Sequence, residues 1–215
     1  MIGSLRYLLI ILIPVVIILA NLNFLIFNKN FYETIYKNVG TYQNFENGKI
    51  VNDATNNLFR FFKDENDLDT DFFSQQAAAH LEDVKILIKK TLLLFYLSLG
   101  ASAATAIILI SKKHAKKLAD ALMVSSIVTI IFMAALQLGF FTIFDKIFIQ
   151  FHRTVFTNDL WFFSSDDNLI KLFPQTFFVE FANRLALNIV ISSAIIIAVS
   201  YLSLRRAERR SNLKP

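Results

Sequence analysis

The chain has 215 residues, of which 55% are hydrophobic and only 18% charged, and its mean hydropathy is +0.50. That much apolar surface cannot be buried in one water-soluble core, so lipid must cover part of it. The absence of Cys excludes disulfides, thiolate metal sites and a thioester acyl-enzyme. The net charge of +5 does not require a nucleic-acid partner, because the distribution of charge matters more than its sign, and we expect none.

Four uncharged apolar runs divide the chain, and each is long enough to cross a membrane. The first covers residues 8–27, about the 20 residues that span ~30 Å of hydrocarbon at 1.5 Å per residue. A cleaved signal peptide ending near Ala20 is the competing interpretation, but the run is too long for a signal h-region. The other runs are 91–111, 121–144 and 185–204. The sequence therefore predicts an all-α integral membrane protein with four transmembrane helices.

Basic clusters indicate which ends of these helices face the cytoplasm. Four lysines follow the second run and four arginines follow the fourth: Lys112, Lys113, Lys116, Lys117, Arg205, Arg206, Arg209 and Arg210. The positive-inside rule puts the loop 112–120 and the tail 205–215 in the cytoplasm, together with the N-terminus. Segments 28–90 and 145–184 would then lie outside and form a mostly extracellular cap. We expect a multi-pass protein of the cell membrane.

The polar segment after the first run carries one of the chain's three histidines. Helical spacing of apolar residues before Gly40 predicts a short surface helix that the glycine ends. A second helix is expected to begin near Ser74, with Ser74 or Asp71 as its N-cap. It carries His80 and Asp83 on one face, so Asp83 can accept a hydrogen bond from the imidazole and orient it. A plain surface pair is the competing interpretation.

The second external segment, 145–184, is rich in aromatic residues and contains His152 and the chain's only Trp. The aromatic residues gathered there are Phe148, Phe151, Phe156, Trp161, Phe162, Phe163, Phe173, Phe177 and Phe178. An interfacial aromatic belt is the simpler interpretation, because aromatic side chains collect at headgroup depth. The alternative interpretation is an active site that closes over lipid chains.

Counting along the helices brings the two external histidines to one level. His80 lies eleven residues before Thr91 and His152 eight after Phe144, so continuous helices would raise them ~16 and ~12 Å above the hydrocarbon. Polar side chains that could be their neighbours are Asp83, Arg153, Asn158 and Asp159. We therefore expect a shared site at the extracellular membrane interface. The histidines would reach a lipid ester because the helices tilt or bend, or because the substrate is drawn up into the cap.

The pattern FHRTVFTNDLW…DDNLIKLFPQTFF, together with HLEDVK earlier in the chain, resembles the lipoprotein intramolecular transacylases, four-helix membrane enzymes of Gram-positive bacteria. The resemblance covers the whole chain in length, helix order and loop placement. The chain departs from the family pattern at Ser164-Ser165, where Asp-Pro often stands, and at Gln175, where a Glu often follows the proline.

The resemblance implies a membrane acyltransferase that moves the sn-2 acyl chain of a diacylglyceryl-modified cysteine to the α-amino group of the same cysteine. The product would be a lyso-form lipoprotein, and the partners would be diacylglyceryl-modified lipoproteins and membrane lipid. Ester to amide is downhill, so neither a cofactor nor a metal is expected. The chain has no G-x-S-x-G motif and no Cys, which suits a mechanism whose nucleophile belongs to the substrate.

In such a reaction His80 and His152 would be catalytic, one taking a proton from the α-ammonium group and one returning a proton to the leaving alkoxide. Asp83 would orient His80, and Arg153 or Asn158 would stabilise the tetrahedral oxyanion. Asp159 and Trp161 are further supporting residues. The walls that fold and enclose the substrate would be aromatic: Phe148, Phe151, Phe156, Phe162 and Phe173.

Two other classes of function remain open from the residues themselves. In a metal-dependent membrane hydrolase His80, Asp83, His152 and Asp159 would be ligands, although no H-E-x-x-H motif is present. In a non-enzymatic membrane sensor or partner protein, the two external segments would only bind another protein.

Overall fold

The computed structural model describes residues 2–212, and within this range the regular structure is entirely helical. The chain separates into two compact units. We call Met1–Asn23, Thr91–Leu138 and Leu185–Pro215 the bundle unit, and Phe24–Lys90 with Gly139–Arg184 the aromatic unit.

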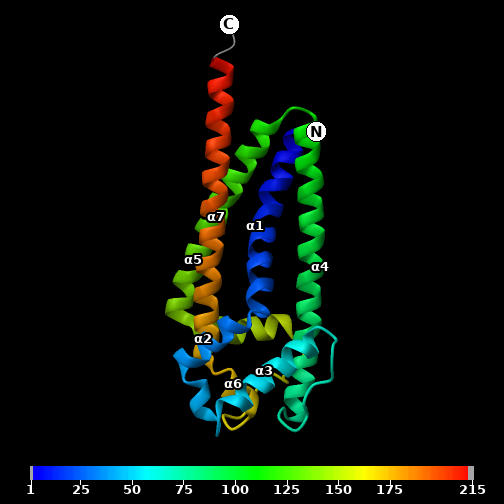
Figure 1. The fold of residues 1–215 in the computed structure, drawn as a ribbon, viewed down its shortest axis with the longest axis vertical. Coiled ribbons are helices and arrows are strands. Elements are labelled where there is room, and N and C mark those ends of the chain that lie inside the picture. Colours follow the sequence, from blue (N-terminus) through cyan, green and yellow to red (C-terminus); the bar gives the residue numbers. More distant parts are fainter. Residues whose placement is uncertain (1, 213–215) are drawn as a thin grey trace. The chain divides into compact units, whose positions relative to one another are not determined.

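Four long helices supply the bundle unit: α1 (Ile2–Ile26), α4 (Gln75–Ser111), α5 (Ala115–Val155) and α7 (Gln175–Asn212). Each contains a stretch long and apolar enough to cross a membrane. The parts of these helices that belong to the bundle unit lie side by side in Figure 1. The predicted all-α membrane fold with four spanning helices is therefore confirmed.

Buried contacts between the helices hold the bundle unit together. Ile17 of α1 packs in one cluster with Met133 of α5 and Ile189 of α7. Arg6 of α1 forms an ion pair with Asp120 of α5, with 2.6 Å between Nε and Oδ2. Many other apolar side chains of these helices are exposed, as a lipid-facing surface requires.

Helix α4 is too long to lie wholly in a bilayer, because 37 residues extend ~55 Å. Its charged residues lie in the first half: Glu82, Asp83, Lys85, Lys89 and Lys90. The part from Thr91 to Ser111 carries no charged residue and belongs to the bundle unit, and residues 75–90 belong to the aromatic unit. The helix begins as predicted, since the Ser74 hydroxyl accepts a hydrogen bond from the Ala77 N–H at 3.2 Å and caps the first turn.

Short helices build the rest of the aromatic unit: α2 (Lys29–Val39), the 3-10 helix η1 (Thr41–Asn44), α3 (Gly48–Phe62) and α6 (Asn168–Leu172). The Asn28 side chain caps α2 by accepting a hydrogen bond from the Phe31 N–H. The helix ends at Gly40, whose φ of +77° is a left-handed conformation that glycine adopts without strain. This is the glycine stop that the sequence predicts.

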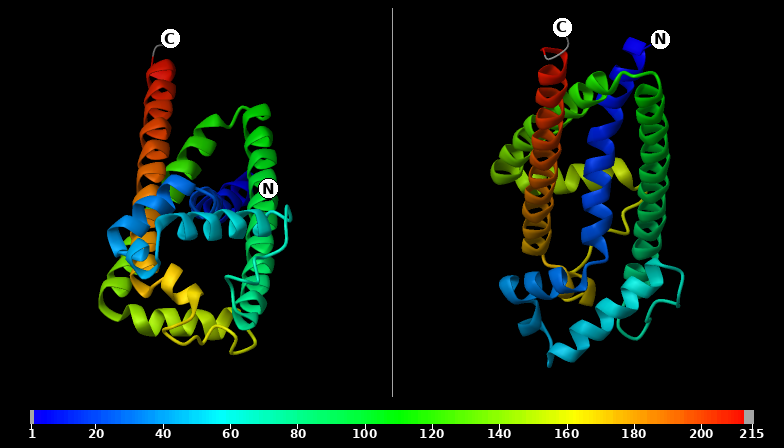
Figure 2. Two further views of the ribbon diagram at one scale, coloured as in Figure 1. Left: turned by 60° about the horizontal axis from the view of Figure 1, so that its bottom comes forward. Right: turned by 45° about the horizontal axis from the view of Figure 1, so that its top comes forward.

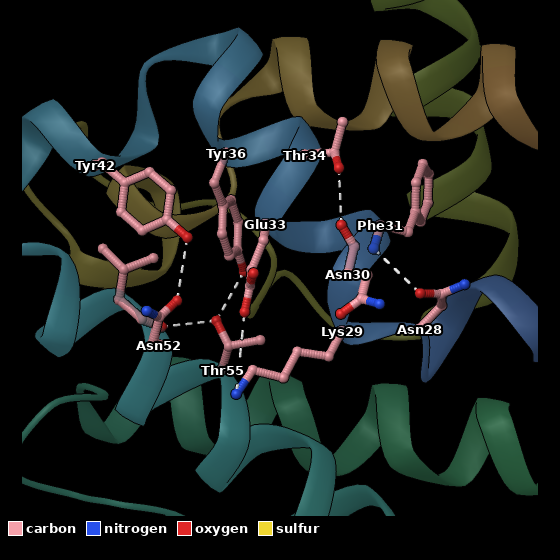
Figure 3. A network of polar contacts seen from close by, with 11 residues as sticks. Asn28, Lys29, Asn30, Phe31, Glu33, Thr34, Tyr36, Tyr42, Asn52 and Thr55 are labelled. Carbon is pink, nitrogen blue, oxygen red and sulfur yellow. Dashed lines mark hydrogen bonds and ion pairs between the residues drawn. The ribbon is translucent and has the colours of Figure 1, made fainter.

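A cluster of aromatic rings forms the core between α2, α3 and the start of α7. Tyr32 contacts the rings of Phe59, Phe173 and Phe177 at centroid distances of 4.8, 6.2 and 5.2 Å. Tyr36 is 1% exposed, and its hydroxyl lies 2.9 Å from the Thr55 hydroxyl of α3 (Figure 3). Burial raises the pKa of Tyr36 well above its ordinary value, so the hydroxyl stays protonated.

An ion pair with two lysines joins the end of α3 to the first part of α4, where the two helices meet in both views of Figure 2. Asp64 lies 2.9 Å from Lys85 Nζ and 2.7 Å from Lys89 Nζ, and these contacts lower the pKa of its carboxyl group. The Lys85 ammonium also lies 4.0 Å from the centre of the Phe61 ring. Asp64 is therefore a structural anchor between α3 and α4.

Helix α5 bends at Ile143, where φ is −142° and ψ is 37°. Gly139 lies just before the bend, and the Thr142 hydroxyl donates a hydrogen bond to its carbonyl oxygen. Both features weaken the regular helix there. The chain then stays helical to Val155, inside the segment predicted as a loop. The Gln175 amide at the start of α7 donates a hydrogen bond to Asp145 just after the bend. This second part of α5 carries His152.

Candidate active site

His80 and His152 lie face to face in the aromatic unit. His80 projects from α4 and His152 from the second part of α5, with ring centroids 6.2 Å apart and planes inclined by 29°. Their exposed fractions are 7% and 9%. Two imidazoles from distant parts of the chain are thus shielded from water together.

A backbone carbonyl fixes the orientation of His152. Its Nδ1 lies 2.8 Å from the Phe148 carbonyl oxygen, one turn earlier in the helix. Because a carbonyl oxygen can only accept, Nδ1 carries the hydrogen, and the neutral ring keeps the lone pair of Nε2 as an acceptor. The pKa of His152 is lowered by burial, an effect that the hydrogen bond to Phe148 partly opposes.

His80 has a free polar atom inside the cluster. Its Nδ1 is buried, and no hydrogen-bond partner for it occurs in the part of the chain that the structure describes. Burial, together with the neighbouring His152, lowers the pKa of His80 to about 4, although the charge of Asp83 opposes the shift. Both rings are therefore neutral near pH 7, and His80 needs a partner that a substrate could supply.

Aromatic side chains enclose the pair. The Phe156 ring lies 5.0 Å from His80 and 5.6 Å from His152. Phe148 and Trp161 cover His152 at 4.2 and 4.9 Å. Trp161 is itself stacked on Phe162 at 3.7 Å, and Phe162 is 53% exposed. The predicted aromatic residues here form a wall around the imidazoles, and Phe162 lies on its exposed outer side.

The sequence predicted a hydrogen bond from His80 to Asp83, and the structure has a different one. Asp83 Oδ2 accepts from Asn158 Nδ2 at 2.9 Å, and His80 Nδ1 has no partner in the residues described. Asp83 affects His80 only through its charge. The carboxylate is turned toward the segment after α5 because that segment offers it an amide donor, which helical spacing alone cannot reveal.

Three other predicted residues lie apart from the imidazoles. Arg153 and Asp159 are exposed, and Arg153 points ~100° away from His152 around the helix, as neighbours in a helix do. Phe173 contacts Tyr32, Tyr36 and Phe177 in the aromatic core. A stretch so rich in Phe does not show which rings face the site and which stabilise the core.

Two further residues, one beside His80 and one bound to the backbone around Trp161, were not among the predicted site residues. Phe163 lies 5.7 Å from His80, and its place in the aromatic run was the available signal. Gln76 Nε2 donates to the carbonyl oxygens of Leu160 and Phe162 at 3.1 and 2.6 Å. No sequence pattern distinguishes this glutamine from its neighbour Gln75.

An open apolar groove of about 530 Å³ runs along one side of α5. Its lining residues are Ile143, Lys146, Ile147, Gln150, Phe151, Thr154 and Val155. Phe151 is 49% exposed and contacts the His152 ring edge-on at 5.4 Å. The groove therefore adjoins the histidine pair through Phe151.

The predicted alternative of a metal centre needs a cluster of ligands. Among the residues that the structure describes, no three His, Asp or Glu side chains come together in a way that could hold a metal ion. His80 and His152 have aromatic rings as their main neighbours. The donor set around them therefore does not fit the metal-dependent hydrolase.

Known proteins include one family that the chain matches and solved structures that share its fold. The family described as lipoprotein intramolecular transacylase Lit matches residues 7–178. No curated relative matches the chain. The solved structure of the membrane-integral lipoprotein intramolecular transacylase Lit from Bacillus cereus has 24% sequence identity and a TM-score of 0.86, with 98% of each chain covered.

Two variants of the Bacillus cereus protein, with a histidine replaced by arginine or by alanine, are each 23% identical to the chain. Their TM-scores are 0.81 and 0.82, with 98% of this chain and 95% and 96% of theirs covered. These likenesses show a common fold, and the family match extends over most of the chain. The chain therefore belongs to the family of lipoprotein intramolecular transacylases, which are membrane acyltransferases.

Proposed function

We propose that His152 transfers the proton and His80 donates a hydrogen bond during acyl transfer within one diacylglyceryl-modified cysteine, from the sn-2 oxygen to the α-amino nitrogen. The observation that carries this proposal is the pair of buried, neutral imidazoles that face each other inside an aromatic wall. A protein without Cys cannot form a thioester acyl-enzyme, and a nucleophile that belongs to the substrate removes the need for any acyl-enzyme. The α-amino group of a lipoprotein is such a nucleophile.

His152 is the base in this proposal. The α-ammonium group has a pKa of ~8 and must lose a proton before its nitrogen attacks the ester carbonyl. With the hydrogen on Nδ1 held by Phe148, Nε2 is free to accept that proton. A bond forms between nitrogen and the carbonyl carbon, and the bond from that carbon to the glyceryl oxygen breaks. The nitrogen gives up two protons on its way from ammonium to amide: one passes through Nε2 to the glyceryl oxygen, and the other is released to water. The step balances with no cofactor.

His80 acts as a hydrogen-bond donor in this proposal. A pKa of about 4 makes its protonated form scarce at neutral pH, so it is poorly suited to donate a proton as an acid. Its neutral N–H can still polarise a carbonyl group, and the unpaired buried Nδ1 is the position available for this. The developing oxyanion would become its missing partner.

The remaining predicted residues have secondary roles in this proposal. Asp83 and Asn158 hold the segment after α5 in place through their mutual hydrogen bond. Phe148 and Phe156 keep water from the carbonyl group, since they already cover the imidazoles. An acyl chain would lie in the groove beside Phe151, whose volume falls within the ~300–1,000 Å³ of typical ligand sites.

Acyl chains are expected to stay on the molecule that carried them. Attack of the α-nitrogen on the sn-2 carbonyl closes a ring of about eight atoms, which a rigid site can favour by an effective molarity of up to ~10⁵–10⁸ M. Lipopeptides of one sequence with isotopically heavy acyl chains are mixed with light ones of a second sequence and incubated with the protein. Mass spectrometry should find every heavy N-acyl group on its original peptide.

A control sample without protein gives the background of spontaneous exchange. Heavy acyl groups on the second peptide above this background would contradict transfer within one molecule. That result would point instead to an acyl-enzyme or to a separate lipid donor. Release of free fatty acid as the main product would favour a hydrolase.

We also propose that the aromatic unit faces the outside of the cell and that both termini are cytoplasmic. The basic clusters around Lys112 and Arg205 support this orientation. Reporter fusions after Ser111 and after Leu204 should then give a cytoplasmic signal, and fusions near Asp64 and Asp166 an external one. A cytoplasmic signal at Asp166 would contradict the proposed position of the active site.

A further inference from the structure

The segment after α5 is tied to the start of α4 by side chains. We call residues 157–167 the Trp161 loop. Asn158 donates to Asp83 at 2.9 Å, and Ser74 donates to Asp167 at 2.7 Å. Between these contacts the Gln76 amide donates to two backbone carbonyl groups of the loop. The loop is therefore held against α4 at its start, its middle and its end.

Gln76 holds the backbone on both sides of Trp161. Its Nε2 lies 3.1 Å from the Leu160 carbonyl oxygen and 2.6 Å from the Phe162 carbonyl oxygen. A carboxamide nitrogen has two N–H groups, so one side chain can satisfy both acceptors. The direction in which the Trp161 side chain leaves the loop thus depends on a residue of another helix.

Trp161 in turn covers the face of the proposed base. Its ring lies 4.9 Å from the His152 ring at an inclination of 33°, and only 7% of its surface is exposed. The Nδ1 edge of the same imidazole is fixed by the Phe148 carbonyl group. The Phe148 carbonyl group holds the edge of the His152 ring, and Trp161 covers its face. Displacement of Trp161 would therefore let the imidazole tilt and would let water reach it.

From these contacts we propose that Gln76 is a positioning residue for acyl transfer, acting through Trp161 on His152. The proposal rests on the role of His152 proposed above. Gln76 touches neither imidazole, and its effect is to keep Trp161 in the one position that covers the base. A shift of ~1 Å at a reacting group can cost about 100-fold in rate, so a small movement of the Trp161 loop is sufficient to slow acyl transfer.

The chain's only tryptophan makes this movement directly measurable. In Gln76→Ala, Trp161 is expected to become more exposed, with emission shifted to longer wavelength and stronger quenching by acrylamide. The turnover rate kcat should fall about 10- to 100-fold, with a smaller change in KM. Gln76→Glu should have at least the same effect, because its carboxylate would face two carbonyl oxygens without a donor.

Gln75→Ala is the matched control, since Gln75 is exposed like Gln76 and precedes it in the same helical turn. It should leave emission, quenching and kcat at their wild-type values. Wild-type emission in Gln76→Ala would overturn the proposal, and so would shifted emission with unchanged kcat. If His152→Asn proves fully active, the proposed base is wrong, while the emission of Gln76→Ala still tests whether Gln76 holds Trp161.

Discussion

His152→Asn is expected to lower the rate of acyl transfer by about 10²- to 10⁴-fold, the usual contribution of general acid–base catalysis. The reason is that Nε2 of His152 is the acceptor for the amine proton, and the variant has no nitrogen that can accept it. His80→Phe keeps an aromatic ring in place and should cost about 10²- to 10³-fold, as loss of one oxyanion donor does. Both rates follow from mass spectrometry of the lipopeptide product.

The third histidine of the chain provides the control. His114 lies in the short turn between α4 and α5, within the bundle unit, so His114→Asn should leave the rate unchanged. Thermal unfolding of all three variants shows whether they keep their fold. Full activity of His152→Asn would contradict the proposed base, and equal loss of stability in His80→Phe and His152→Asn would favour a purely structural pair.

Tyr36→Ala is expected to lower the stability of the aromatic unit by about 3–5 kcal/mol, the typical cost of removing a large buried ring. Tyr36 is 1% exposed and lies among the rings of Tyr42, Phe173 and Phe177. The cavity left behind would also deprive the Thr55 hydroxyl of one partner. Trp161 belongs to the same unit, so its fluorescence can follow the unfolding.

Tyr36→Phe separates the ring from its hydroxyl group. It should cost only ~1 kcal/mol, because Thr55 can still donate to the Val51 carbonyl oxygen at 2.8 Å. If Tyr36→Phe and Tyr36→Ala lose similar amounts of stability, the hydrogen bond, and not the packing of the ring, supports this core. A Tyr36→Ala variant as stable as the wild type would contradict the proposed importance of the cluster.

Local signals allowed the membrane helices and several helix ends to be predicted. A membrane demands about 20 uncharged residues in succession, which is a strong pattern even in one sequence. The stop at Gly40 and the cap at Ser74 were predictable because each depends on a residue and its nearest neighbours. The four spanning helices and the family resemblance are both confirmed.

The partners of individual side chains in the site could not be predicted. Asp83 was predicted to bind His80, three residues away, but it binds Asn158, which follows 75 residues later. Phe173 was expected beside the substrate, and its ring lies with the tyrosines of α2. Such choices depend on how the loop after α5 folds back onto α4, which helical periodicity does not encode.

The pairing of Asp64 with Lys85 has a consequence for the effect of salt. Dissolved ions screen exposed charges over a Debye length of ~3 Å at 1 M, but they screen shielded pairs much less. The Lys85 side chain is 10% exposed, whereas Arg60 and Glu65, which form a looser pair nearby, are 61% and 50% exposed. Concentrated salt should therefore weaken the Arg60 pair first and leave the Lys85 ammonium between Asp64 and the Phe61 ring. Because Asp64 itself is 55% exposed, the attachment of α3 to α4 would then be less sensitive to ionic strength than the Arg60–Glu65 pair, but not insensitive to it.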